Sequence, residues 1–142
     1  MEIITTHKNT DFDALASVIA ATILFPDAVP VLPKSLNPNV KAFLSIHKDL
    51  FEIQTPGQID YSKVKKLIVV DTSRWSRLEK MKQLQRRDDL EIIIWDHHPD
   101  PGDMNASWKC HEQIGANITL MFRDLKPRDL ALSPIQATLF LM

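Results

Sequence analysis

Three short segments of the sequence combine carboxylates with imidazoles, side chains that commonly bind divalent metal ions. The first segment holds His7, Asp11 and Asp13 within seven residues. The second contributes Asp71, and the third is the tripeptide Asp96-His97-His98. Oxygen and nitrogen ligands without a thiolate suit Mn²⁺, Mg²⁺, Fe²⁺ or a catalytic zinc ion, and they argue against a structural zinc site.

This set of side chains is large enough for two metal ions. Two ions about 3.5 to 4 Å apart, bridged by a shared aspartate, clamp both oxygens of an in-line phosphoryl displacement. They also lower the pKa of water toward neutrality and offset the charge that builds on the phosphate oxygens. The residue types therefore predict hydrolysis of a phosphoester or a phosphoanhydride.

A strand-like run precedes each of the three segments. Residues 3–6 are apolar or β-branched and lead to His7, the continuous apolar run 67–70 ends at Asp71, and the run 90–95, apolar except for Glu91, ends at Asp96. Continuous apolar runs are typical of parallel strands that are buried on both faces. Because ligand sites collect at the carboxyl ends of such strands, we expect the three segments to converge on one crevice.

Helical patterns alternate with these strands. Apolar residues at helical spacing run from Phe12 until Pro26, and Asn37 with Pro38 begins a second helix. Ser76 and Glu79 form a capping box, which predicts a third helix.

Further elements complete the pattern. Weaker strand patterns cover residues 28–32, where Pro30 favours a sheet edge, and residues 107–110. Helical patterns cover residues 114–125 and begin again at Ser133. We predict an α/β fold with a mainly parallel, Rossmann-like sheet flanked by helices.

Length and composition exclude several classes of protein. The 142 residues are 44% hydrophobic and 25% charged, as expected for one globular domain rather than a disordered chain or a coiled coil. A net charge of -1 gives no global basic field for nucleic acid. Cys110 is the single cysteine, no signal peptide is evident, and the apolar run 14–26 is too short to cross a bilayer. These features predict a cytoplasmic protein without a membrane span.

The sequence ends at Leu139-Phe140-Leu141-Met142, inside a helical pattern and without a C-cap glycine or a polar tail. We therefore expect a domain that is truncated at its C-terminal end. The apolar surface of this last helix would favour a homodimer.

Some of these residues also have a structural explanation. Asp11 suits a helix N-cap, Asp71 suits the cap of a turn, and a single histidine is more often part of a core or a surface. Three clusters at three strand ends favour a shared site over separate caps. Arg74 and Arg77 follow Asp71, and we interpret them as solvated or ion-paired rather than phosphate-binding.

The three segments resemble a known family. The residues from His7 to Ala14, Val70-Asp71-Thr72 and Asp96-His97-His98 are similar, in this order, to the first three motifs of the DHH phosphoesterase superfamily. The resemblance implies an N-terminal DHH domain over residues 1–142 that depends on Mn²⁺, with Mg²⁺ as an alternative. It implies a two-metal-activated water that cleaves a phosphodiester in a nucleotide or a short oligonucleotide.

The resemblance also implies roles for individual residues. It assigns one ion to His7, Asp11 and Asp71 and a second ion to Asp13, Asp71 and His97, so that Asp71 is a bridging and catalytic residue. The family's fourth motif, with another aspartate ligand, and its second domain are absent from the sequence. The second ion should therefore be held weakly, and we expect little activity from this chain alone.

Other residues are implied to act beside the ions. His98 would face the substrate phosphate or assist the leaving group, and Asp96 would orient a ligand imidazole. Asn9 would organise the turn after the first strand. Thr10 stands where many members have proline, which should change the stiffness of the turn more than the chemistry.

Two alternatives remain open for the function. Pyrophosphate or polyphosphate is the alternative substrate. Residues 61–71, 115–117 and 132–138 are similar to DHH domains fused to CBS pairs and a tRNA nucleotidyltransferase or poly(A) polymerase-like domain. A metal- or nucleotide-binding regulatory module of a longer chain is therefore the alternative role. In a third interpretation the acids are only caps in an ordinary α/β domain.

Overall fold

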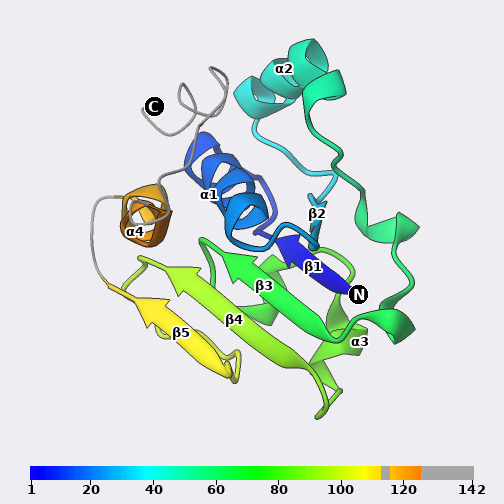
Figure 1. The fold of residues 1–142 in the computed structure, drawn as a ribbon, viewed down its shortest axis with the longest axis vertical. Helices are drawn as coiled ribbons and strands as arrows, with labels where there is room; N and C mark the ends of the chain where they lie inside the picture. The colour runs from blue at the N-terminus through cyan, green and yellow to red at the C-terminus, as the bar shows by residue number, and fades with distance from the viewer. Residues whose placement is uncertain (113–115, 126–142) are drawn as a thin grey trace.

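The computed structural model describes residues 1–112 and 116–125. Its core is a sheet of five parallel strands in the order β2-β1-β3-β4-β5 (Figure 1). The strands are β1 (Glu2–Thr5), β2 (Val29–Val31), β3 (Lys66–Val70), β4 (Glu91–Asp96) and β5 (Trp108–His111). The predicted parallel α/β sheet is confirmed, and Pro30 lies in an edge strand, where its missing N–H is tolerated.

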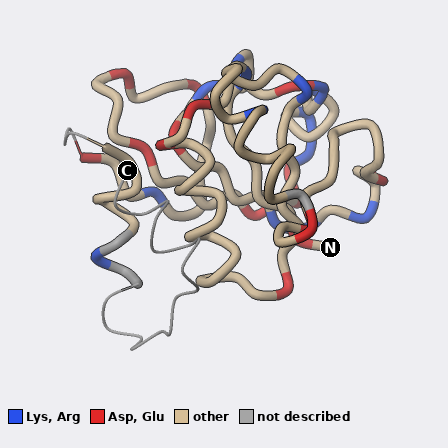
Figure 2. The backbone as a smooth tube through the Cα atoms, turned by 90° about the horizontal axis from the view of Figure 1, so that it is seen from above, with Lys and Arg blue, Asp and Glu red and all other residues tan. Residues whose placement is uncertain are grey.

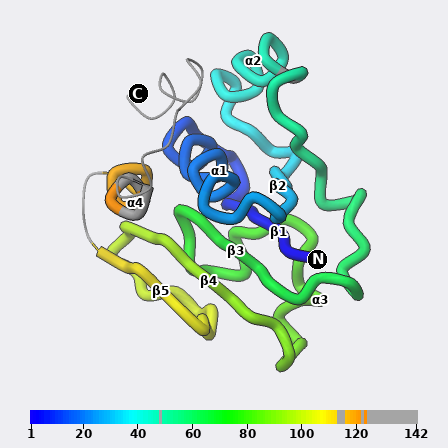
Figure 3. The backbone as a smooth tube through the Cα atoms, in the orientation of Figure 1, coloured from blue at the N-terminus to red at the C-terminus, as the bar shows by residue number. Residues whose placement is uncertain are grey.

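Within the described residues, four α-helices accompany the sheet: α1 (Phe12–Leu24), α2 (Pro38–His47), α3 (Lys82–Gln85) and α4 (Asn117–Leu125). Helices α1 and α4 lie side by side over the same face of the sheet (Figure 3). The predicted start of α2 is confirmed, because Asn37 Oδ1 accepts a hydrogen bond of 2.9 Å from the Asn39 amide.

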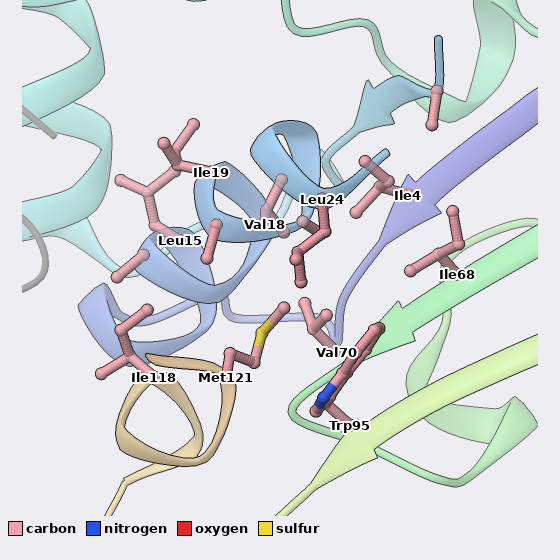
Figure 4. Close-up of a cluster of buried hydrophobic side chains, with 14 of the residues drawn as sticks. Ile4, Leu15, Val18, Ile19, Leu24, Ile68, Val70, Trp95, Ile118 and Met121 are labelled. Carbon is pink, nitrogen blue, oxygen red and sulfur yellow. The ribbon is translucent and has the colours of Figure 1, made fainter. Parts of the chain in front are cut away.

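One apolar cluster fills the space between the sheet and the helices α1 and α4 (Figure 4). Leu15 and Ile19 of α1 and Met121 of α4 are buried in the same cluster as Val70 and Trp95, which project from the strands. Burying a side chain of this size contributes about 1.5–3 kcal/mol to folding. This packing holds the N-terminus of α4 near the start of α1.

The opposite face of the sheet carries a second apolar cluster. Leu67, Val69 and Ile94 point into it from β3 and β4, and Met81 and Leu84 cover them. With both faces covered, the continuous apolar runs of these strands are explained.

The helix predicted to begin at Ser76 does not form. The chain makes the 3₁₀ turn Trp75–Arg77, and α3 begins only at Lys82. Lys80 has a left-handed φ of 57°, which interrupts a helix, and the Glu79 carboxylate accepts a hydrogen bond of 2.9 Å from the Lys34 amide instead of closing a capping box. The apolar residues of this segment are nevertheless buried.

Charged residues of both signs are scattered over the described backbone, in line with the near-neutral net charge (Figure 2). None of the helices in the described part of the chain has the length and apolar character needed to cross a membrane. The helix predicted from Ser133, and the homodimer expected from it, lie outside the described residues.

Candidate metal centre

The candidate centre lies where β1, β3 and β4 end. These strands are neighbours in the sheet, with Thr5 paired to Val69 and Val70 paired to Trp95, so the segments that follow them leave from the same edge. Two groups of potential ligand atoms form there, His7 with Asp11 and Asp71, and Asp71 with His97 and His98, each with atoms within 4.8 Å of one another. The expected convergence of the three segments is confirmed.

Asp71 is the centre of this arrangement. Its carboxylate is only 2% exposed, with His7 Nε2 at 3.0 Å from Oδ2 and His97 Nε2 at 2.9 Å from Oδ1. Although His97 is this close, no donor among the described residues meets hydrogen-bond geometry at Oδ1. A buried carboxylate oxygen in this state is costly unless a positive charge compensates for its lost hydration.

The backbone of Asp71 adopts a strained conformation where its carboxylate lies between His7 and His97. Its φ of 66° is left-handed, which aspartate tolerates better than most residues, and its amide donates to Trp95 O at 2.8 Å. Strain of this kind costs about 1–3 kcal/mol and is concentrated at functional sites.

The hydrogen bonds of His7 determine what its second nitrogen offers. Nδ1 lies 2.8 Å from Lys8 O, a group that only accepts, so Nδ1 carries a proton. In the neutral ring the lone pair of Nε2 then faces Asp71 Oδ2, which is unfavourable unless a proton or a metal ion lies between them. Burial is the largest single influence on the pKa of His7 and lowers it, but the hydrogen bonds with Asp71 and Lys8 O and the charges of Asp71 and Asp11 together outweigh burial, so the net pKa is raised. The same geometry is typical of metal-binding histidines, whose other N–H binds a carbonyl.

Asp11 and Asp13 begin α1. Asp11 is the N-cap, as its structural explanation predicts, because Oδ1 accepts a hydrogen bond of 2.8 Å from the Ala14 amide. Asp11 also belongs to the first group of ligand atoms, so capping and ligation are compatible.

Asp13 faces the N-terminus of α4. Its oxygens accept hydrogen bonds of 3.0 Å from the Asn117 amide and 2.9 Å from the Ile118 amide. Its Oδ2 also lies 3.5 Å from His97 Nε2. Burial and the charge of Asp71 raise the pKa of Asp13, and the two amides oppose this shift. An additional positive charge would therefore stabilise the site.

The two histidines of the tripeptide Asp96-His97-His98 contact different carboxylates. His97 approaches Asp71 and Asp13, whereas Asp96 Oδ1 lies 2.7 Å from His98 Nδ1. Asp96 thus orients His98, the imidazole that the family resemblance assigns to the substrate.

Asn9 and Thr10 hold the turn after β1. Asn9 has a left-handed φ of 57°, and its amide and carboxamide both contact Ser35. The buried Thr10 donates its hydroxyl to His7 O at 2.9 Å. Asn9 therefore links the turn to Ser35, and the hydroxyl of Thr10 adds a hydrogen bond that proline lacks.

Two supporting residues were not predicted from the sequence. Ser73 donates its hydroxyl to the buried Asp96 Oδ2 at 2.7 Å, and Asn117 Nδ2 donates to Ser17 Oγ at 3.0 Å. A serine two residues after a strand-end aspartate is a weak signal, since serine is common in turns. The helical periodicity begins before Asn117, so it does not identify Asn117 as the first residue of α4.

The residues present fit divalent ions. The ligand atoms are oxygens and nitrogens, the buried Asp71 belongs to both groups, and its Oδ1 has no hydrogen bond among the described residues. These features suit hard or intermediate cations with oxygen and imidazole ligands.

Comparison with known proteins gives consistent results. The chain is 31% identical over its full length to an A-adding tRNA nucleotidyltransferase of Geobacter sulfurreducens and 26% identical over 97% of its length to one of Aquifex aeolicus. It spans 16% of the length of each of these relatives. An exopolyphosphatase-related protein of Bacteroides fragilis has the same fold, with a TM-score of 0.71, 17% identity, and coverage of 90% of this chain and 39% of that one. The family model for the DHH family, N-terminal domain, matches residues 2–139, and the chain belongs to this family.

Proposed function

We propose that the chain is the metal-binding part of a phosphohydrolase that cleaves a phosphodiester in a nucleotide or a short oligonucleotide. The observation that carries this proposal is the buried Asp71 carboxylate, which is shared by both groups of potential ligands and lies between two imidazoles. Membership of the DHH family supports a phosphoesterase in general.

The proposed ligands are His7, Asp11 and Asp71 for one ion and Asp13, Asp71 and His97 for the other. The second set differs from the second group of ligand atoms, which contains His98 in place of Asp13, but Asp13 Oδ2 lies 3.5 Å from His97 Nε2. Mn²⁺ is the proposed ion, because mixed carboxylate and imidazole ligands suit it, and Mg²⁺ is the alternative. Two bound ions would lower the pKa of water and neutralise charge on the phosphate oxygens.

His98 is the residue proposed to act on the substrate. His98 Nδ1 lies 2.7 Å from Asp96 Oδ1, so Nε2 is the ring nitrogen that remains available to exchange a proton with the substrate. About half of the His98 side chain is exposed. Asp96 is itself held by Ser73 and is 2% exposed. We propose that His98 donates a hydrogen bond to a phosphate oxygen or a proton to the leaving group.

The long relatives support a second candidate function. Both are A-adding tRNA nucleotidyltransferases in which the matching segment is a small part, so the domain also fits a metal- or nucleotide-binding module of such an enzyme. In either role we propose that further domains of a longer chain are its partners. Hydrolysis distinguishes the two functions, because a binding module holds the ion without turnover.

Calorimetric titration of Mn²⁺ into the 142-residue chain tests the proposal. We expect saturable binding that is lost in Asp71→Asn, which keeps the size of the side chain but removes the shared charge. The matched control is Asp27→Asn at an exposed position outside the site, which should bind as the unchanged chain does. No binding by the unchanged chain, or equal binding by Asp71→Asn, would contradict the proposal.

Turnover is then compared on three substrates: a short oligonucleotide, pyrophosphate and polyphosphate. Metal-dependent release of nucleotide that needs Asp71 supports the phosphodiesterase, and release of phosphate from pyrophosphate or polyphosphate favours the alternative substrates. Because little activity is expected from the 142-residue chain alone, the same assay is made on a longer chain that carries further domains, and Mn²⁺ binding without any turnover there favours the binding module.

A further inference from the structure

A cavity of about 280 Å³ opens beside the candidate metal centre. Its lining combines Asp71, Asp96 and His98 with two arginines, Arg74 and Arg77, from the turn after β3. The volume is close to the lower end of the range of about 300–1,000 Å³ that small-molecule sites enclose. The cavity therefore has room for a small ligand next to the proposed ions.

The two arginines are not equivalent. Arg74 Nε forms an ion pair with Asp100, so its charge is already balanced, as its interpretation as an ion-paired residue predicts. Arg77 is exposed, and no carboxylate of the described residues forms an ion pair with it. Arg77 is one of the residues that line the cavity, and its exposed side chain agrees with the expectation of a solvated residue while leaving its charge without a carboxylate partner among the described residues.

The backbone of Arg77 is fixed relative to the candidate centre. Arg77 O accepts a hydrogen bond of 2.8 Å from the Lys8 amide, directly after His7 in the sequence. The ammonium of Lys8 adds positive charge nearby, since Nζ donates to Ser76 O at 3.2 Å. The guanidinium is thus carried on a turn that is attached to the His7 segment.

The carboxylates that line the cavity are already engaged. Asp71 lies between two imidazoles, and Asp96 accepts from Ser73 and His98. The groups left to contact a ligand are the guanidinium of Arg77, which only donates hydrogen bonds, and the second ring nitrogen of His98, whose role depends on whether it carries a proton. A planar guanidinium matches the oxygens of phosphate better than any other side chain.

We propose that Arg77 binds a phosphate group of the substrate in this cavity. The inference rests on the proposed function, which places the reacting phosphate at Asp71, and it goes further by assigning a protein ligand to phosphate oxygens beside the ions. The ligand class is a phosphate ester or a phosphoanhydride.

Inorganic phosphate is the probe for this site. It is titrated into the 142-residue chain with Mg²⁺, a diamagnetic ion, present, and binding is followed by NMR shifts. The variants are Arg77→Ala, Arg77→Lys and, as a control with the same change of charge, Arg86→Ala at an exposed position outside the cavity. We expect Arg77→Ala to weaken phosphate binding about tenfold or more, the effect of one charge-assisted hydrogen bond, with Arg77→Lys intermediate and Arg86→Ala unchanged.

Phosphate affinity in Arg77→Ala equal to that of the unchanged chain, or no phosphate binding by the unchanged chain, overturns the inference. The Mn²⁺ titration separates this result from the proposed function, since Arg77→Ala removes no proposed ligand and should keep the metal affinity. If Mn²⁺ does not bind but phosphate binding still requires Arg77, the phosphate site stands and the proposed function fails.

Discussion

Asn117 donates its backbone amide to Asp13 Oδ2 at 3.0 Å, although the two residues are 104 positions apart in the sequence. The next amide, of Ile118, donates to the other oxygen at 2.9 Å. The N-terminus of a helix carries partial positive charge, so α4 orients the carboxylate of Asp13 and partly compensates for its burial. A potential metal ligand is therefore held in place before any ion binds.

Asn117→Ala tests this connection. The variant loses the buried hydrogen bond from Nδ2 to Ser17 Oγ, which attaches α4 to α1, and we expect it to lower the free energy of unfolding by about 1 kcal/mol. Because the start of α4 is then less well fixed against Asp13, Mn²⁺ affinity should also fall. Chemical denaturation and calorimetry measure the two effects. The control is Thr119→Ala at an exposed position of α4. If both variants have the same free energy of unfolding and the same Mn²⁺ affinity, α4 does not hold Asp13 in place.

The place of the candidate site was predictable from the sequence because it follows from topology. Buried apolar runs that end in Asp71 and Asp96 indicate parallel strands, and the carboxyl ends of neighbouring parallel strands share one edge. The contact between Asp13 and α4 was not predictable in this way. Periodicity shows that a helix has an apolar face, but which helix it packs against depends on the fit of the whole core.

The helix expected at Ser76 was wrong for a different reason. A capping box and apolar spacing were both present, but the Glu79 carboxylate forms a hydrogen bond with the Lys34 amide, and Lys80 adopts a left-handed φ of 57°. Lysine gives no local signal for that conformation. Long-range hydrogen bonds outweighed local propensity here, and the turn that results is the one that carries Arg77.

Ser73→Ala tests the support of the imidazole of His98. The variant removes the hydroxyl that donates to Asp96 Oδ2 at 2.7 Å, and Asp96 is 2% exposed. A buried carboxylate oxygen that loses its donor costs about 1–3 kcal/mol, so the free energy of unfolding should fall by that amount. Urea denaturation measures it. Ser76→Ala, at an exposed position nearby, should change it by less than about 0.5 kcal/mol, and a similar small effect for Ser73→Ala would count against this role.

Gly102→Ala tests the packing of the loop that follows β4. Gly102 has a φ of 76°, and a Cβ atom there would lie 2.0 Å from Ser73 O, so any side chain must displace the loop or the turn after β3. We expect a loss of about 1–3 kcal/mol in the free energy of unfolding, together with weaker phosphate binding. Gly57→Ala is the matched control, because nothing lies within 4 Å of its Cβ position. Equal stability of the two variants would show that the contact is not required.

The raised pKa of His7 predicts how stability depends on pH in the absence of metal ions. Burial lowers this pKa most strongly of any single cause, but the hydrogen bonds with Asp71 and Lys8 O and the nearby carboxylate charges together raise it above its usual value of 6.5. The folded state then binds the proton more tightly than the unfolded state, so the stabilisation is complete below about pH 6.5 and is lost as the pH rises through the raised pKa. Denaturation in EDTA should therefore show that the stability difference between the unchanged chain and His7→Gln shrinks with rising pH. A difference that stays constant between about pH 6 and 9 would falsify the coupling of His7 to Asp71.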